Sequence, residues 1–246
     1  MQTSLLPAAA GKVALVTGAA GGIGGTAVRL FLDAGCRVAA ADRKPAAGAD
    51  QRVMHLVFDA ADETQVAGAM ADIKTRLGGI DYLVHMAGAV GKGRLDQMAL
   101  GDWREVVDAN LTSAFLLLKH AYPLLRKPGG AVVLCASSNA ANGGSYLSGP
   151  AYASSKAALM NLTRYCAKEW APDGIRVNAI SPGPVDTPML DRLSADQHAG
   201  LKAALPLGKY ATADECAGAV LFLCSPHAAS MTGTIMNISS GLVLDR

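Results

Sequence analysis

The sequence is poor in charged and aromatic residues. Of its 246 residues, only 17% are Asp, Glu, Lys or Arg and only 5% are Phe, Trp or Tyr, whereas 51% are hydrophobic. The core must therefore be built from Ala, Val, Leu and Ile, which is typical of helices packed on a buried parallel sheet. The low charge content also suggests that copies of the same chain cover part of its surface.

Long runs of one charge sign are missing as well. Lys and Arg number 22 and Asp and Glu 20, so the formal net charge is +2. No basic run is longer than the pairs Arg43–Lys44 and Arg126–Lys127. The sequence therefore has no electrostatic footprint for nucleic acid or for an anionic membrane surface, and we expect neither partner.

Paired cysteines and long apolar runs are also absent. The five cysteines are Cys36, Cys135, Cys166, Cys216 and Cys224. Their odd number and the lack of a C-x-x-C pair fit neither a disulfide framework nor a zinc site, so we expect reduced thiols, no metal and a cytoplasmic protein. No apolar run reaches the roughly 18 residues of a membrane span. Residues 1–10 lack the pattern of a secretion signal and are expected to form a short flexible arm.

Short apolar segments alternate with helical stretches along the chain. The expected strands are residues 12–17, 37–41, 53–58, 81–86, 131–136, 175–180 and 234–238. The expected helices are residues 23–34, 63–77, 103–125, 151–170 and 213–223. This alternation predicts an α/β fold with a doubly wound parallel sheet of about seven strands and helices on both faces. No low-complexity linker divides the chain, so we expect a single domain over residues 1–246.

A glycine-rich turn follows the first expected strand. The segment T-G-A-A-G-G-I-G, residues 17–24, leads directly into a helix. Gly18, Gly22 and Gly24 allow a tight turn and let a pyrophosphate approach backbone N–H groups at the positive helix end, beside Ile23. A glycine cluster between a strand and a helix predicts a dinucleotide-binding site.

The second expected strand ends in A-A-A-D-R, which puts Asp42 near the ribose of an adenosine. An NADP 2′-phosphate about 5 Å away would be repelled by roughly 2–7 kcal/mol, so Asp42 favours NAD over NADP. Arg43 is the opposing feature, because its guanidinium could turn toward a phosphate. Asp59 ends the third strand and either accepts from an adenine amino group or, like Asp62, caps a helix.

Tyr152 and Lys156 lie four residues apart in S-G-P-A-Y-A-S-S-K-A-A-L-M, residues 148–160. In a helix this spacing puts both side chains on one face. Making a tyrosine a base near pH 7 requires a shift of about three pKa units, or roughly 4 kcal/mol. An ammonium about 4 Å away at an effective dielectric of about 20 contributes that much. The pair is therefore expected to exchange a proton with a substrate oxygen.

The motifs follow one another in a familiar order. They are T-G-x-x-x-G-I-G near the start, Asn110 in D-A-N-L, a serine pair ending a strand, Y-x-x-x-K, and S-P-G-P-V-D-T-P after the next strand. Together they resemble the short-chain dehydrogenase/reductase family, from about Gly11 to Leu244. The resemblance implies a Rossmann-type fold, an NAD(P) cofactor, and a homotetramer built through the helices that contain Asn110 and Tyr152.

The resemblance also implies catalytic roles. Tyr152 matches the acid/base, and Lys156 matches the residue that lowers its pKa and binds the nicotinamide ribose. Asn110 matches the residue that holds a water behind the lysine. The serine that steadies the substrate oxygen is predicted to be Ser138, with Ser137 second, because counting forward from the strand and back from the tyrosine disagree by one residue.

The cofactor's nicotinamide end is matched by four further positions. Pro182 and Gly183 match the turn against which the ring packs, and Val185 and Thr187 match groups that hold its carboxamide.

The motif after the fourth expected strand departs from the family's pattern. Where the family has N-N-A-G, this chain has the four residues His85, Met86, Ala87 and Gly88. We expect His85 to replace some hydrogen bonds of the missing Asn, Met86 to pack, and Ala87 and Gly88 to border the cofactor.

These residues predict an NAD-dependent oxidoreductase that interconverts a secondary alcohol and a ketone. One alternative is an NADP-dependent 3-oxoacyl-acyl-carrier-protein reductase, against which Asp42 and Asp173 weigh. Another is a non-catalytic dinucleotide-binding sensor, against which Tyr152 and Lys156 weigh. The partner is a small alcohol or ketone, enclosed by residues 145–147 and by an apolar segment, residues 189–205, that forms a lid or covers the core.

Overall fold

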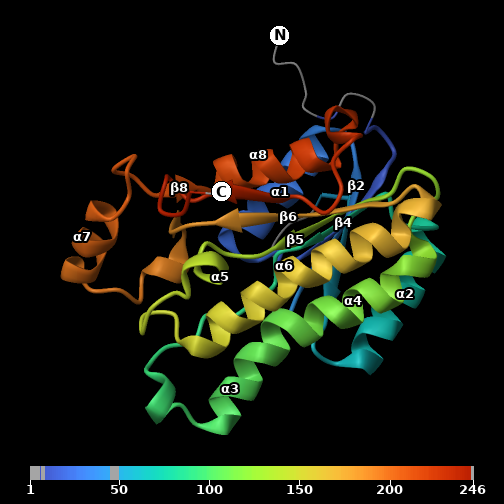
Figure 1. Cartoon of the computed structure of the whole chain (residues 1–246). Helices are drawn as coiled ribbons and strands as arrows, with labels where there is room; N and C mark the ends of the chain where they lie inside the picture. The colour runs from blue at the N-terminus through green and yellow to red at the C-terminus, as the bar shows by residue number, and fades with distance from the viewer. Residues whose placement is uncertain (1–5, 7–8, 45–49, 245–246) are drawn as a thin grey trace.

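A parallel sheet forms the centre of the computed structural model, which describes residue 6, residues 9–44 and residues 50–244 (Figure 1). Over these residues the strand order is β3-β2-β1-β4-β5-β6-β9, and all six neighbouring pairs are parallel. The strands are β1 (Val13–Thr17), β2 (Arg37–Asp42), β3 (Val53–Val57), β4 (Tyr82–His85), β5 (Ala131–Cys135), β6 (Arg176–Pro182) and β9 (Ile235–Ile238). The order reverses between β1 and β4, so a crevice opens at the carboxyl ends of these strands.

Helices cover both faces of the sheet (Figure 1). They are α1 (Gly22–Asp33), α2 (Glu63–Leu77), α3 (Leu100–Val107), α4 (Ser113–Ala121), α5 (Asn139–Asn142), α6 (Pro150–Trp170), α7 (Ala195–Ala203) and α8 (Ala213–Cys224). α1 and α8 pack on one face and α2, α4 and α6 on the other, while α7 projects from one end (Figure 1). Within the described residues, no helix combines the length and apolar character needed to cross a bilayer.

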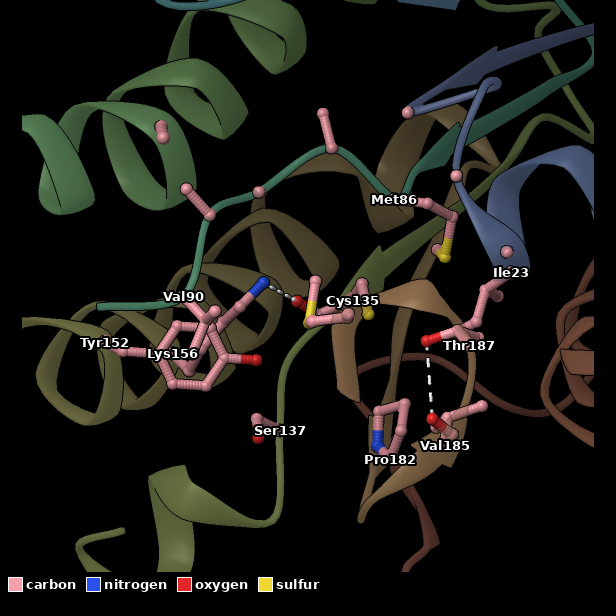
Figure 2. Close-up of a pocket in the computed structure, with 18 of the residues that line it drawn as sticks. Ile23, Met86, Val90, Cys135, Ser137, Tyr152, Lys156, Pro182, Val185 and Thr187 are labelled. Carbon is pink, nitrogen blue, oxygen red and sulfur yellow. Dashed lines mark hydrogen bonds between the residues drawn. The ribbon is translucent and has the colours of Figure 1, made fainter. Parts of the chain in front are cut away.

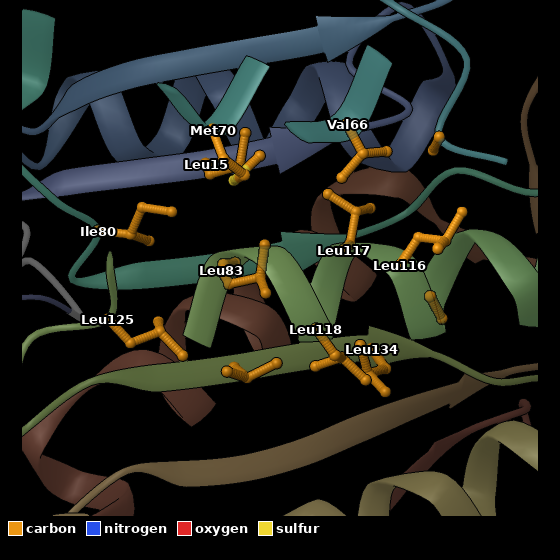
Figure 3. Packing of buried hydrophobic residues seen from close by; sticks show 14 of the residues in the cluster. Leu15, Val66, Met70, Ile80, Leu83, Leu116, Leu117, Leu118, Leu125 and Leu134 are labelled. Atoms are coloured by element: carbon orange, nitrogen blue, oxygen red, sulfur yellow. The ribbon is translucent and has the colours of Figure 1, made fainter. Parts of the chain in front are cut away.

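The two faces of the sheet form two hydrophobic clusters. Because side chains alternate along a strand, Leu15 of β1 points to one face and its neighbour Val16 to the other. Leu15 lies beside Met70 of α2, in a cluster that also holds Leu83, Leu134 and leucines of α4 (Figure 3). Val16 packs with Phe31 of α1 and with α8. Burial on both faces holds the carboxyl ends of the central strands in fixed positions.

The α/β architecture with a seven-stranded parallel sheet and helices on both faces is confirmed. The helix expected over residues 103–125 is not one regular α-helix, because a π-helical turn, η2 (Asp108–Thr112), separates α3 from α4. A short parallel pair, β7 (Val185–Asp186) with β8 (Ala211–Thr212), was not predicted. Most of the N-terminal arm expected over residues 1–10 lies outside the described residues, although Leu6 and Ala9 are buried.

Candidate functional site

A cavity of about 690 Å³ lies at the carboxyl ends of the central strands. Every residue predicted to contact the cofactor lines it: Gly18, Gly22, Ile23, Gly24, Asp42, Arg43, Asp59, Ala87, Gly88, Tyr152, Lys156, Pro182, Gly183, Val185 and Thr187. Ser138, Tyr152 and Lys156 of the predicted catalytic residues also line it, whereas Asn110 is fully buried behind the wall. The fold therefore gathers residues that are up to 169 positions apart, Gly18 and Thr187, around one cavity (Figure 2).

The glycine-rich turn leaves no room for side chains. A Cβ on Gly24 would lie 2.1 Å from the carbonyl oxygen of Gly18, and one on Gly22 would lie 2.4 Å from Cγ2 of Thr187. Gly18 has a φ of +69°, and its Cβ would meet the backbone of Ala87 at 2.7 Å. The first turn of α1 contains no acidic residue and no side-chain cap, so its N–H groups remain for an anion. This cradle fits the pyrophosphate of a dinucleotide.

Asp42 ends β2 at the opposite side of this turn. One of its carboxylate oxygens accepts from the backbone N–H of Ala20 at 3.0 Å, and the other accepts from that of Lys44 at 3.1 Å. Asp62 caps α2 by accepting from the N–H of Gln65, so the capping role left open between Asp59 and Asp62 falls to Asp62. Asp59 stays on the cavity wall and accepts from the N–H of Ala61.

Lys156 is almost fully buried on the face of α6 that meets β5. Its Nζ donates a 2.6 Å hydrogen bond to the carbonyl oxygen of Cys135, the last residue of β5, and lies 5.7 Å from the centroid of the Tyr152 ring (Figure 2). Burial lowers the pKa of Lys156. The carbonyl therefore fixes the position of the ammonium relative to the tyrosine, an anchor that the sequence did not reveal.

In the structure the pKa of the Tyr152 phenol is raised, whereas the sequence led us to expect a lowered pKa. Burial raises its pKa to about 12, and a hydrogen bond from Ser137 and the charge of Arg192 oppose this rise. The ammonium of Lys156 lies beside the ring and is bonded to the Cys135 carbonyl. Near pH 7 the phenol therefore carries its proton and can donate it.

Both serines of the predicted pair line the cavity. Ser137 lies near the Tyr152 hydroxyl (Figure 2), and its hydroxyl is one of the groups that lower the pKa of Tyr152. Ser138 begins the turn into α5, and its N–H donates to the carbonyl of Pro182 at 2.8 Å.

Asn110 lies in the π-helical turn η2, where the regular helix ladder is interrupted. Its Nδ2 donates to the carbonyls of Ala89 and Val106, both at 2.7 Å, while its Oδ1 is buried without a partner among the described residues. A Cβ on Gly88 would lie 2.5 Å from this Oδ1 and 3.4 Å from Nζ of Lys156. The unused acceptor and the ammonium therefore approach the same point of the cavity wall.

His85 braces the strand ends, as expected where the family's Asn is missing. Its Nδ1 lies 2.7 Å from Thr17 Oγ1 and its Nε2 lies 3.2 Å from Ser113 Oγ. The hydroxyl of Ser113 donates to the carbonyl of Ala109 at 2.8 Å, so Ser113 Oγ must accept from the Nε2–H of His85. Nδ1 of His85 then carries no proton and must accept from the hydroxyl of Thr17. This directed chain links β1, β4 and the end of η2, and burial lowers the pKa of His85 to about 3.

Beyond Tyr152 the cavity is bordered by a largely apolar wall. Its lining includes Met189, Leu190, Leu193 and Leu201, all from the segment predicted to be a lid or a core cover. α7, which supplies Leu201, contains no buried residue, so this helix borders the cavity and does not cover the core. Ser145 and Leu147 also line the cavity. Arg192 lines it too, although the sequence analysis did not single it out.

Comparison with known proteins identifies similar sequences over nearly the whole chain. Residues 18–243 match the family model described as Enoyl-(Acyl carrier protein) reductase. Cis-4-hydroxycyclohexanecarboxylate dehydrogenase of Sinomonas cyclohexanicum is 37% identical over 242 residues, covering 94% of this chain and 96% of that protein. A 3-oxoacyl-acyl-carrier-protein reductase of Thermotoga maritima is 33% identical over 244 residues, covering 95% and 98%.

Solved structures share the same architecture. A short-chain dehydrogenase/reductase from Brucella melitensis, described as a glucose/ribitol dehydrogenase, superposes with a TM-score of 0.89 at 29% identity and covers 96% of this chain and 98% of its own. Aldohexose dehydrogenase from Thermoplasma acidophilum, in ligand-free form, superposes with a TM-score of 0.87 at 29% identity, covering 97% and 94%.

The buried histidine predicts a specific pH dependence of stability. Its pKa is about 3 in the folded protein and about 6.5 in the unfolded chain, so stability is complete above pH 6.5 and falls as the pH drops toward 3. Between pH 7.5 and 5.5, His85 should account for about 1.4 kcal/mol of lost unfolding free energy. Urea denaturation of the parent and of His85→Asn at both pH values measures this difference.

The unfolding free energy of His85→Asn should fall by about 1.4 kcal/mol less than that of the parent between pH 7.5 and 5.5, whatever the stability of the variant at pH 7.5. His55→Asn replaces an exposed histidine of β3 and serves as the control. Equal losses in the parent and in His85→Asn would show that His85 is not held neutral by the fold.

Proposed function

This chain belongs to the short-chain dehydrogenase/reductase family, and from that premise we propose that it is an NAD-dependent oxidoreductase interconverting a secondary alcohol and a ketone. That it is an enzyme acting on CH–OH groups follows from its relatives. The cofactor class, NAD(P), follows from the family. The choice of NAD, the roles of individual residues and the assembly are our proposals.

One observation carries the catalytic assignment. Tyr152, with Ser137 near its hydroxyl and Lys156 beside its ring, lines the same cavity as the glycine-rich turn. A proton donor and a dinucleotide cradle in one enclosure are what a carbonyl reduction requires. We assign Tyr152 as the acid/base and Ser137 as the hydroxyl that steadies the substrate oxygen. Ser138 becomes the second choice.

When bound, the cofactor supplies or accepts the hydride, and the protein handles the proton. In the reducing direction, Tyr152 donates its phenolic proton to the carbonyl oxygen as negative charge develops there, and its raised pKa keeps it protonated until then. In the oxidising direction the phenol must accept the alcohol proton. Lys156 then stabilises the phenolate from its anchored position, and the unpartnered Oδ1 of Asn110 is left on the same side to accept a hydrogen bond from a water.

The cofactor residues divide along the cavity. The turn around Gly18, Gly22, Ile23 and Gly24 would hold the pyrophosphate, and Lys156 and Tyr152 the nicotinamide ribose. Pro182, Gly183, Val185 and Thr187 would hold the nicotinamide ring and its carboxamide, and Asp59, Ala87 and Gly88 would border the adenosine half. Asp42 supports NAD, because its carboxylate is held at the ribose end where a 2′-phosphate would be repelled.

A second activity has specific support. The family model that matches is described as Enoyl-(Acyl carrier protein) reductase, and a 3-oxoacyl-acyl-carrier-protein reductase is 33% identical. An NADP-dependent reductase of carrier-bound chains is therefore the alternative within this enzyme class. Asp42 weighs against a preference for NADP. Asp173 weighs against binding of an acidic carrier protein, because it pairs with Lys127 and so neutralises a basic residue near the start of β6.

Exposed aromatic side chains and free thiols support the proposed assembly and location. Phe115 of α4 and Tyr165 of α6 are 50% and 62% exposed, which supports a homotetramer built through these helices. Five unpaired cysteines, four of them buried, support a reducing compartment, the cytoplasm. The sheet takes its strands from residue 13 to residue 238, which supports a single domain over residues 1–246.

Replacing Tyr152 by Phe should abolish turnover but not cofactor binding. The phenyl ring keeps the packing of α6, while the exchangeable proton is lost, so kcat should fall about 10²- to 10⁴-fold. NADH formation over a panel of secondary alcohols and hydroxy acids, with NADH binding followed by fluorescence, measures both. The panel includes cis-4-hydroxycyclohexanecarboxylate and, in the reducing direction, a 3-oxoacyl thioester.

Tyr165→Phe is the matched control, since Tyr165 lies exposed on the same helix, and it should retain parental activity. A chain that binds NADH but turns over no alcohol or ketone in any form would be a dinucleotide sensor. Faster turnover of the thioester with NADPH than of any alcohol with NAD would favour the carrier reductase.

Asp42→Ala should weaken the preference for NAD. Removing the carboxylate removes both the ribose acceptor and the repulsion of a 2′-phosphate, and Arg43 remains to pair with that phosphate. The ratio of kcat/KM for NAD to that for NADP should fall about 10- to 1,000-fold. Asp33→Ala, at an exposed position of α1 outside the cavity, should leave the ratio unchanged. A parent that already prefers NADP would refute the assignment.

A further inference from the structure

Arg192 is an exposed residue that lines the cavity in the apolar segment that follows Thr187. Among the described residues that line the cavity between positions 188 and 201, its neighbours are Pro188, Met189, Leu190, Leu193 and Leu201, all apolar. The acidic lining residues Asp42 and Asp59 lie at the ends of β2 and β3, and Glu105 and Asp108 come from α3 and η2. An apolar wall with a single cation selects for a ligand that is apolar over most of its surface and anionic at one point.

The guanidinium is held in place but is not neutralised. One of its nitrogens donates a 2.7 Å hydrogen bond to the carbonyl of Leu147, which belongs to the segment just before α6. Over the part of the chain that the structure describes, no carboxylate lies within ion-pair distance of Arg192, whereas Arg52 and Arg94 each have one and Arg29 has two. The remaining N–H groups of the fork are therefore left to donate to a ligand.

The charge of Arg192 acts on the Tyr152 phenol. It is one of the two influences that lower the pKa of Tyr152, the other being the hydrogen bond from Ser137. The bond to Leu147 ties the guanidinium to the loop that leads into the tyrosine's helix. Both observations place its charge near Tyr152 and the loop before α6.

We propose that Arg192 binds a carboxylate of the substrate, so that the alcohol is a hydroxy acid and the ketone an oxo acid. The carboxylate lies apart from the reacting carbon, with an apolar body between them that packs against Met189, Leu190 and Leu193. Guanidinium and carboxylate match in geometry and form two parallel hydrogen bonds. The proposal rests on the oxidoreductase function above and adds the substrate class to it.

The test compares acids with their neutral esters. Parent, Arg192→Gln and Arg192→Lys are assayed with NAD on hydroxy acids, 4-hydroxycyclohexanecarboxylate among them, and on the methyl esters of the same acids. With Arg192→Gln, kcat/KM for the acid should fall about 10- to 100-fold, mainly through KM, and that for the ester should change less than about threefold. Arg192→Lys should recover part of the loss, because it keeps the charge and loses the fork.

Lys202→Gln is the matched control. It removes a positive charge from α7, close in sequence, from a side chain that lies over the ring of Tyr210 and does not line the cavity, so both substrates should be unaffected. Equal losses for acid and ester with Arg192→Gln would overturn the proposal, and so would a rise in the KM for NAD, which would assign Arg192 to the cofactor. Turnover of neutral alcohols but of no acid would also overturn it while leaving the oxidoreductase function intact. No turnover of any alcohol would refute that function itself.

Discussion

The site depends on one buried charge, the ammonium of Lys156. A buried cation is costly unless it is hydrogen-bonded, and here the carbonyl at the end of β5 satisfies it. That bond forms because Cys135, the last residue of β5, lies beside Lys156 of α6. Gly88 leaves room for the lysine and for Asn110, because a Cβ at this position would lie 2.5 Å from Asn110 Oδ1 and 3.4 Å from Lys156 Nζ. The ammonium thus fixes the relation between the strand ends and the helix that presents Tyr152.

The surrounding fold supplies this arrangement through the topology of the sheet. The order of the strands reverses between β1 and β4, so the cavity opens where Thr17, Met86 and Cys135 end or follow their strands. The hydrogen bonds of His85 hold two of these strand ends to the start of α4, just after the π-helical turn. Rigid strand ends and the fully hydrogen-bonded chain of Thr17, His85 and Ser113 hold the base of the cavity in shape. The loops at its rim can then differ in sequence to suit different substrates.

The sequence predicted the seven strands, the main helices and the lining of the cofactor cradle, because hydrophobic periodicity and glycine spacing are local signals. It did not predict the π-helical turn, the Cys135 anchor or the cavity position of Arg192, which arise from contacts between distant segments. The choice between Ser137 and Ser138 illustrates this limit. Counting residues cannot tell where a loop absorbs an insertion, whereas the structure shows which serine acts on the pKa of Tyr152, and we therefore propose Ser137.

The central claim is that the hydrogen on the carbinol carbon passes to the cofactor while Tyr152 transfers the proton. The most direct measurement incubates the protein with NAD and a secondary alcohol deuterated at that carbon, and determines the mass of the reduced cofactor. The account predicts one deuterium in the NADH formed by the parent and no NADH above background with Tyr152→Phe. Unlabelled NADH from the parent, or unchanged transfer with Tyr152→Phe, would contradict it.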